Sequence, residues 1–156
     1  MEKKWHTRED SGIRLDRKLR WWHDDLPVEH PRIIETFNQG LRVAEDGRFK
    51  LEIGNDWCFV TVEDAAFEVL AIDLSLDARV SARLSDRTAE YLDLTSLAVD
   101  DQGVLSARVK NGRAKARFSR DAQFALGTML ESEGDRWVLR VGEKQWPTSI
   151  SGLPHP

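Results

Sequence analysis

The sequence of 156 residues contains a single cysteine, Cys58, so no intrachain disulfide can form. It also lacks any Cys-x-x-Cys pair of the kind that holds zinc or carries out redox exchange. Cys58 lies beside Phe59 in an apolar segment, a position typical of a small buried hydrophobe rather than a reactive thiolate. These absences exclude a disulfide framework, and we expect a protein of a reducing cytoplasm.

Long apolar runs are missing as well. No stretch approaches the roughly 18 residues that a membrane span requires. The polar residues 1–11 lack the apolar core of a signal peptide and are expected to be loose. The net charge of −4 offers no excess of Lys and Arg, which nucleic acids and anionic membranes select. We therefore expect a soluble cytoplasmic protein with no nucleic-acid partner and no membrane partner.

Glycines are scattered rather than clustered, and this excludes a Gly-rich phosphate-binding loop. No Gly-x-Ser-x-Gly elbow surrounds Ser119 or Thr128, so the usual nucleophile arrangement of an α/β hydrolase is absent too. The sequence predicts no catalytic residue, no metal site and no cofactor.

Short segments in which apolar and polar residues alternate are plentiful, and they indicate half-buried strands. Residues 13–23 predict a hairpin, and residues 48–53 predict a second hairpin with residues 57–62 around a turn led by Gly54. A third antiparallel pair is expected between residues 66–74 and 78–84.

Two segments follow helical spacing. Apolar residues at positions 33, 34, 37 and 41 predict a helix that begins at Pro31 and ends at Gly40 in a left-handed cap. Ala114, Phe118 and the apolar residues at 122, 125 and 129 favour a helix over residues 112–131. The Asn-Gly pair at 111–112 is also the strongest available hairpin signal, so a strand after it remains the alternative.

The pattern of residues 46–57 returns in residues 134–146, with matching aromatic, leucine and glycine positions, and a predicted helix precedes each copy. This internal repeat predicts an α+β fold of two repeated helix-plus-antiparallel-hairpin units packed together, with mostly antiparallel sheet. The expected units are residues 13–74 and residues 75–156, the second with connecting strands and a short tail.

Residues 45–51 read Glu-Asp-Gly-x-aromatic-x-Leu, and residues 62–67 read Val-Glu-Asp-Ala-Ala-Phe. With the Pro-led helix before them, these motifs resemble the bacterial family called domain of unknown function 1285. The resemblance covers residues 13–148 and rests mainly on residues 43–67. It implies an α+β fold with repeated motifs, and a supposed ligand-binding or signal-transduction role without a defined ligand.

Three residues of this chain, Glu63, Asp64 and Phe67, match the possible family signature. Ala66 departs from the family pattern, which has Pro at that position. The turn at residues 54–56 also lacks the family's lysines, which puts any function of that charged turn in doubt. Since adjacent residues of a strand point to opposite faces, we expect Glu63 and Asp64 to have structural roles.

The most concentrated positive charge lies in residues 108–120. On a helix, Arg113, Arg117 and Arg120 would share one face and could bind a phosphate or an acidic partner. Trp21 and Trp22 are adjacent, so one must face away from the core of a strand, and Trp22 is the candidate for ligand contact. The first hypothesis is therefore a non-catalytic ligand-binding or signalling module for a small anionic ligand or a protein partner.

Two further hypotheses remain open. His23 and His30, with nearby carboxylates, have ligand chemistry suited to a metal ion, but they straddle a turn and favour a structural interpretation. A hydrolytic enzyme could use His23 with Asp24 or Asp64. A protein-interaction adaptor could instead work through an exposed sheet edge. The oligomeric state is not predicted.

Overall fold

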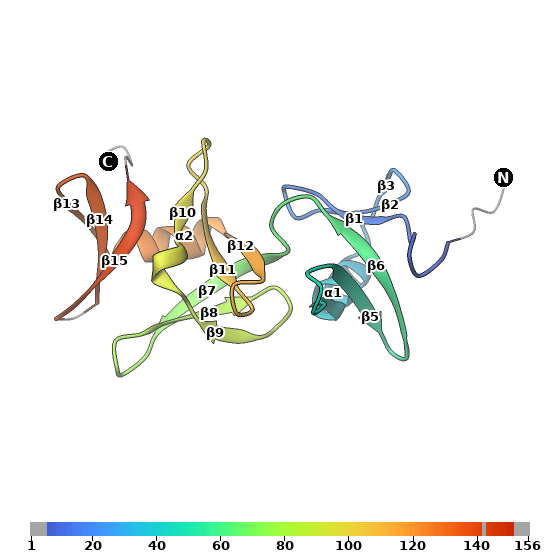
Figure 1. Ribbon diagram of the computed structural model, residues 1–156, viewed down its shortest axis with the longest axis horizontal. Helices are drawn as coiled ribbons and strands as arrows, with labels where there is room; N and C mark the ends of the chain where they lie inside the picture. Colours follow the sequence, from blue (N-terminus) through green and yellow to red (C-terminus); the bar gives the residue numbers. More distant parts are fainter. Residues whose placement is uncertain (1–5, 142, 152–156) are drawn as a thin grey trace. The chain divides into compact units, whose positions relative to one another are not determined.

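A computed structural model describes residues 6–141 and 143–151 of the chain (Figure 1). The chain forms two compact units that divide between Ala66 and Phe67, here called unit 1 and unit 2. Two α-helices and mostly antiparallel strands make up the described residues, so the predicted α+β class is confirmed. Neither of these helices has the length and apolar character needed to cross a bilayer.

Unit 1 contains one sheet of six strands in the order β3-β2-β1-β6-β5-β4. The strands are β1 (Ile13–Leu15), β2 (Trp21–His23), β3 (Leu26–Pro27), β4 (Leu41–Val43), β5 (Phe49–Ile53) and β6 (Asp56–Val62). The predicted hairpins β1–β2 and β5–β6 are confirmed. The central pair is different, because β1 and β6 run parallel, with Arg14 opposite Thr61.

The helix of unit 1, α1 (Pro31–Gly40), begins where it was predicted. His30 is its N-cap, and the His30 Nδ1 accepts a hydrogen bond from the backbone N–H of Arg32 at 3.2 Å. The helix packs against β5, and the ring of Phe37 meets the buried ring of Trp21 edge-on at 5.3 Å.

The predicted left-handed cap at Gly40 is wrong, since the φ angle of Gly40 is not positive and the chain enters β4 directly at Leu41. Gly40 is needed for another reason. A Cβ atom at this position would lie 2.3 Å from the backbone carbonyl oxygen of Glu52 on β5. The close approach of helix and strand therefore excludes any side chain at Gly40.

Unit 2 contains a six-stranded sheet in the order β10-β11-β12-β7-β8-β9 and a three-stranded sheet in the order β13-β14-β15. The first sheet comprises β7 (Phe67–Leu74), β8 (Val80–Leu84), β9 (Ala89–Tyr91), β10 (Ala98–Val99), β11 (Leu105–Val109) and β12 (Ala114–Phe118). The second comprises β13 (Leu130–Glu133), β14 (Arg136–Val141) and β15 (Lys144–Ser151). A 3₁₀ turn, η1 (Leu94–Ser96), contacts β15, and α2 (Arg120–Gly127) packs against β7 and β12.

The predicted helix over residues 112–131 is wrong. Lys110, Asn111 and Gly112 all have positive φ angles and turn the chain from β11 into β12, so the hairpin signal prevails. The apolar spacing was misleading because positions 114 and 118 are separated by four residues, a distance that fits both a helical turn and strand alternation. Residues 114, 116 and 118 are all buried, which is the period of a strand. Helix α2 starts only after Ser119, its N-cap.

The two six-stranded sheets share one connectivity. In each, a first meander of three strands is followed by a second, and the first and last strands pair in parallel, as β1 with β6 and β7 with β12. The residues with this shared connectivity are 13–62 and 67–118. The repeat predicted from the sequence relates other residues, 46–57 and 134–146. The predicted repeat of helix-plus-hairpin units stays a prediction.

Candidate functional site

Unit 1 contains a cavity of about 360 Å³ formed by three stretches of chain, of which the third is far from the other two in sequence. Its walls come from the N-terminal segment, from the end of β2 with the turn after it, and from β6. The lining residues are His6, Glu9, Asp10, Ser11, Gly12, Ile13, Arg14, Trp22, Asp24, Asp25, Phe59, Val60 and Thr61. A concave site with convergent polar groups is the usual location of ligand binding.

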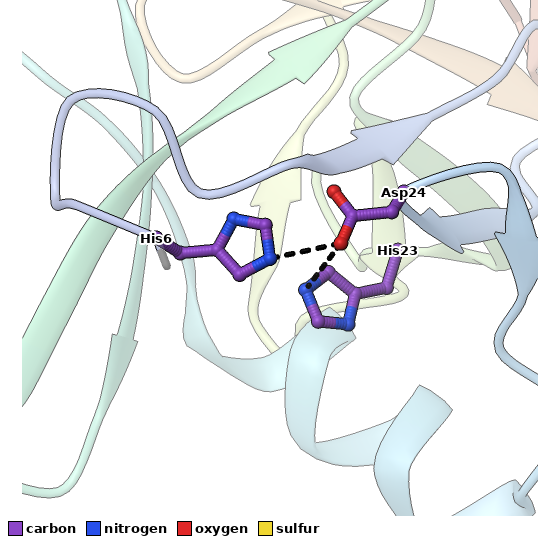
Figure 2. Close-up of side chains that lie close together, drawn as sticks. All are labelled: His6, His23 and Asp24. Atoms are coloured by element: carbon purple, nitrogen blue, oxygen red, sulfur yellow. Dashed lines mark ion pairs between the residues drawn. The ribbon is translucent and has the colours of Figure 1, made fainter. Parts of the chain in front are cut away.

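His6 and Asp24 in the cavity wall form a cluster with His23. The Nε2 atom of His6 lies 2.8 Å from Oδ2 of Asp24, and the Nε2 atom of His23 lies 3.7 Å from the same oxygen. Figure 2 shows both imidazoles directed at this single carboxylate oxygen. Within residues 6–141 and 143–151, no other three His, Cys, Asp or Glu ligand atoms form a group this compact.

The turn between β2 and β3 presents the Asp24 carboxylate. His23 is paired with Leu26, so Asp24 and Asp25 form a two-residue turn, with φ angles of 56° and 80°. Such turns demand left-handed backbone, and aspartate tolerates it better than most residues. The backbone N–H of Asp24 donates to the carbonyl of Gly12 at 2.9 Å, which joins the turn to the N-terminal segment.

Gly12 is required at this contact. Its φ angle is +74°, and a Cβ atom would lie 2.2 Å from Oδ1 of Asp24 and 3.1 Å from Cε1 of His6. A side chain at position 12 would therefore displace the carboxylate from the cluster. The glycine lets the N-terminal segment pass close beneath the turn.

The N-terminal segment that carries His6 is held along β6. The backbone N–H of Phe59 donates to the carbonyl of Arg8 at 2.7 Å, and the Ser11 hydroxyl donates to the carbonyl of Phe59 at 2.7 Å. The guanidinium of Arg8 also lies 4.9 Å from the centre of the Trp57 ring. The prediction that residues 1–11 are loose is thus wrong for residues 6–11, and residues 1–5 lie outside the described part of the chain.

Trp22 lines the cavity, whereas the adjacent Trp21 is 1% exposed and belongs to the core. The indole N–H of Trp22 donates to the buried carboxylate of Asp16 at 2.9 Å. Burial alone would raise the pKa of Asp16, but hydrogen bonds from backbone and side-chain donors, the Trp22 indole among them, lower it below its usual value. Asp16 thus stays ionised and orients Trp22; ligand contact by Trp22 stays a prediction.

The three arginines predicted to form one basic face do not share a helix. Arg113 belongs to the turn after β11, Arg117 to β12, and Arg120 to the first turn of α2. Arg117 lies opposite Glu68 of β7, and its charge opposes the burial that raises the pKa of Glu68. The prediction that the three arginines share one helical face is wrong, and binding of an anion by these residues stays a prediction.

Two residues of the possible family signature, Glu63 and Phe67, contribute to the framework, and a structural role for Asp64 stays a prediction. The carboxylate of Glu63 accepts from the Arg14 guanidinium at 2.8 Å and from the backbone N–H of Arg17 at 3.2 Å. Phe67 is 1% exposed in the core of unit 2, and the ammonium of Lys110 lies 5.1 Å from the centre of its ring. Asp64 is exposed between β6 and β7.

His6 was missed because nothing in the polar residues before Gly12 predicts where the segment runs. The pairing of His23 with His30 was considered because both are close in sequence, but His30 caps α1. The only local signal was the Asp24-Asp25 pair, which marks the turn. The segment that carries His6 is held by β6, which begins more than 30 residues after Asp24. No local sequence pattern predicts a contact between such distant residues.

The fold is α+β, with two six-stranded sheets in each of which a parallel strand pair joins two antiparallel halves. No protein-family model matches the chain, and no curated protein matches it. Among solved structures, a DUF1285 family protein from Silicibacter pomeroyi DSS-3 is similar, with a TM-score of 0.65 and 18% identity over 89% of this chain and 80% of that one. A DUF1285 family protein from Shewanella baltica OS155 is also similar, with a TM-score of 0.55 and 14% identity over 76% of this chain and 91% of that one.

The chain therefore has a DUF1285-like fold, and the resemblance noted in the sequence is confirmed at the level of the fold. At these identities the likeness establishes the fold alone. The function has to be argued from the side chains of this chain.

Proposed function

We propose that the protein is a non-catalytic ligand-binding module whose unit 1 cavity binds a small cation. The observation that carries this proposal is the charge of the lining residues that the structure describes, of which four carry a carboxylate and one carries a guanidinium. The carboxylates belong to Glu9, Asp10, Asp24 and Asp25, and the guanidinium belongs to Arg14. A concave acidic surface concentrates cations, because its low-dielectric walls focus the field of the carboxylates.

Among the residues that the structure describes, the Arg14 guanidinium does little to balance this charge. Its Nη1 atom lies 2.8 Å from the Glu63 carboxylate, so Arg14 already has its own counter-ion. Glu9 is paired with Arg48 at 3.2 Å, and Asp24 is paired with the imidazoles of His6 at 2.8 Å and His23 at 3.7 Å. The cavity therefore favours a positive ligand over the anionic ligand that the sequence suggested.

Neither Ser11 in the cavity wall nor Cys58 on β6 has the surroundings of a nucleophile, which favours binding over catalysis. The Ser11 hydroxyl donates to the Phe59 carbonyl, so its proton is directed at the backbone and not at a histidine. Burial raises the pKa of the Cys58 thiol, which disfavours the thiolate. The 3.7 Å between His23 and Asp24 is longer than a hydrogen bond, and the hydrolytic use of His23 stays a prediction.

A thermal-shift screen tests the proposal with spermidine, putrescine, Ca²⁺, Mn²⁺ and Zn²⁺ as cations and with citrate and inorganic phosphate as anions. We expect at least one cation to raise the Tm and both anions to leave it unchanged. A ligand present at a hundredfold its Kd stabilises the folded state by about 2.7 kcal/mol, which is a readily measured shift.

The matched variants are Asp25→Asn in the cavity and Asp101→Asn in an exposed turn of unit 2. Both remove one negative charge, and asparagine tolerates the left-handed backbone of position 25. Asp25→Asn should at least halve the cation-induced shift, whereas Asp101→Asn should preserve it. Equal shifts in both variants, or a response to the anions alone, would contradict a cation site in this cavity.

A further inference from the structure

We infer that His6, His23 and Asp24 form a binding site for a divalent transition-metal ion such as Zn²⁺. This inference rests on the proposed function, since it names the chemical class of the cation. Two neutral imidazoles and one carboxylate are a ligand set that zinc and its first-row neighbours prefer, whereas Ca²⁺ and Mg²⁺ prefer oxygen ligands alone.

The spacing of the ligand atoms suits such an ion. Metal–ligand bonds of about 2.0–2.1 Å place two ligands of a tetrahedral ion about 3.3 Å apart. The carboxylate oxygen of Asp24 lies 2.8 Å from Nε2 of His6 and 3.7 Å from Nε2 of His23, on either side of that value. The three ligand atoms lie within 4.8 Å of one another, so small side-chain rotations bring them around one ion.

The framework holds the ligands together before any ion arrives. Asp24 is fixed by its left-handed turn and by its N–H bond to Gly12, and the segment carrying His6 is fixed on β6 through Arg8 and Ser11. The ring centroids of His6 and His23 are 4.9 Å apart. Ligands that are already gathered lose little conformational freedom when they bind.

The site is also exposed to solvent, and the protein supplies fewer ligands than a tetrahedral ion takes. The side chains of His6 and Asp24 are 25% and 29% exposed, and that of His23 is 50% exposed. Three protein ligands leave at least one position of a tetrahedral ion open, as in zinc sites that hold water or a small molecule. His6 and Asp24 belong to the cavity wall, so this position would be available to a molecule in the cavity.

Isothermal titration of the untagged full-length protein with ZnCl₂, and absorption spectroscopy with CoCl₂, test the site. We expect one Zn²⁺ per chain with a micromolar or lower Kd, and visible Co²⁺ bands of an intensity that indicates a four- or five-coordinate ion. His6→Ala and His23→Ala should each weaken Zn²⁺ binding at least tenfold and abolish the Co²⁺ bands.

His30→Asn is the matched control, because it removes an imidazole from unit 1 while keeping a good helix N-cap. It should bind Zn²⁺ as the parent does. Gly12→Ala is a second probe, since it keeps all three ligand residues but displaces the Asp24 carboxylate. It should also weaken binding at least tenfold, with the circular dichroism spectrum used to confirm that each variant is folded.

Binding unchanged in a folded His6→Ala/His23→Ala double variant, or no binding below 1 mM Zn²⁺ in the parent, would overturn the inference. Failure of the proposed function is distinguishable from this result. If spermidine or Ca²⁺ stabilises the parent and Asp25→Asn removes that effect, the acidic cavity stands while the metal site fails. If Zn²⁺ binding requires the histidines but Asp25→Asn reduces the Tm shift of no cation, the metal site stands and the wider cavity proposal fails.

Discussion

Replacement of Gly40 by alanine is expected to destabilise unit 1 by about 3 kcal/mol, one of the largest effects available to a single methyl group. The new Cβ would lie 2.3 Å from the carbonyl oxygen of Glu52 and 3.3 Å from a methyl group of Leu51. The obstacle is the backbone of β5, so α1 or the strand has to shift. Urea unfolding followed by tryptophan fluorescence measures the loss.

Gly127→Ala is the matched control for this variant. Gly127 also ends a helix, α2, but nothing lies within 4 Å of an added Cβ, and its φ angle is not positive. Alanine favours helix over glycine by up to about 1 kcal/mol, so this variant should be as stable as the parent or slightly more stable. A Gly40→Ala protein as stable as the parent would show that α1 does not approach β5 this closely.

Removal of the Lys110 ammonium is expected to destabilise unit 2 by about 2–3 kcal/mol at neutral pH. Lys110 Nζ lies 2.7 Å from Oδ2 of Asp86, whose side chain is only 3% exposed. It also donates to the hydroxyl of Thr88 at 2.8 Å. Lys110→Met keeps the aliphatic stem but leaves the Asp86 carboxylate buried without its cation. The free energy of unfolding in urea measures the effect, and Lys18→Met, at an exposed position of unit 1, should change it by less than about 0.5 kcal/mol.

The effect should depend on pH in a defined direction. Burial alone would raise the pKa of Asp86, but the hydrogen bonds from Lys110 and Thr88 outweigh it and lower the pKa below its usual value. A carboxyl with a lowered folded-state pKa contributes stability above its unfolded pKa of about 3.9, and this contribution is lost as the pH falls through the folded pKa. The stability gap between the parent and Lys110→Met should therefore narrow below about pH 4. A gap that stays constant from pH 7 to pH 3 would show that Lys110 contributes through packing alone.

Local patterns predicted much of unit 1. The alternation in residues 48–62 and the turn at Gly54 determine the β5–β6 hairpin, and Pro31 with its cap determines the start of α1. These features depend on neighbours in sequence, which is why they could be predicted. The segment after Asn111 was misjudged because positions 114 and 118 satisfy both periodicities. The Asn-Gly turn and the pairing of β12 with β11 and β7 select the strand.

The candidate site could not be predicted in the same way. Its ligands come from a segment without periodicity and from a turn, and they meet only because Gly12 permits the approach and β6 anchors the segment. The opposite error was made for the arginines. Helical spacing predicted one shared face for Arg113, Arg117 and Arg120, but these residues belong to a turn, to β12 and to α2.

The parallel pairing of β1 with β6 has a consequence for synthesis of the chain. His6, His23 and Asp24 leave the ribosome first, whereas the strand that holds their segment emerges only after α1, β4 and β5. Contacts between such distant residues have a high cost in chain entropy until the last strand arrives. A nascent chain that stops before Asp56 therefore carries all three side chains but no site, and the site forms only when β6 closes the sheet.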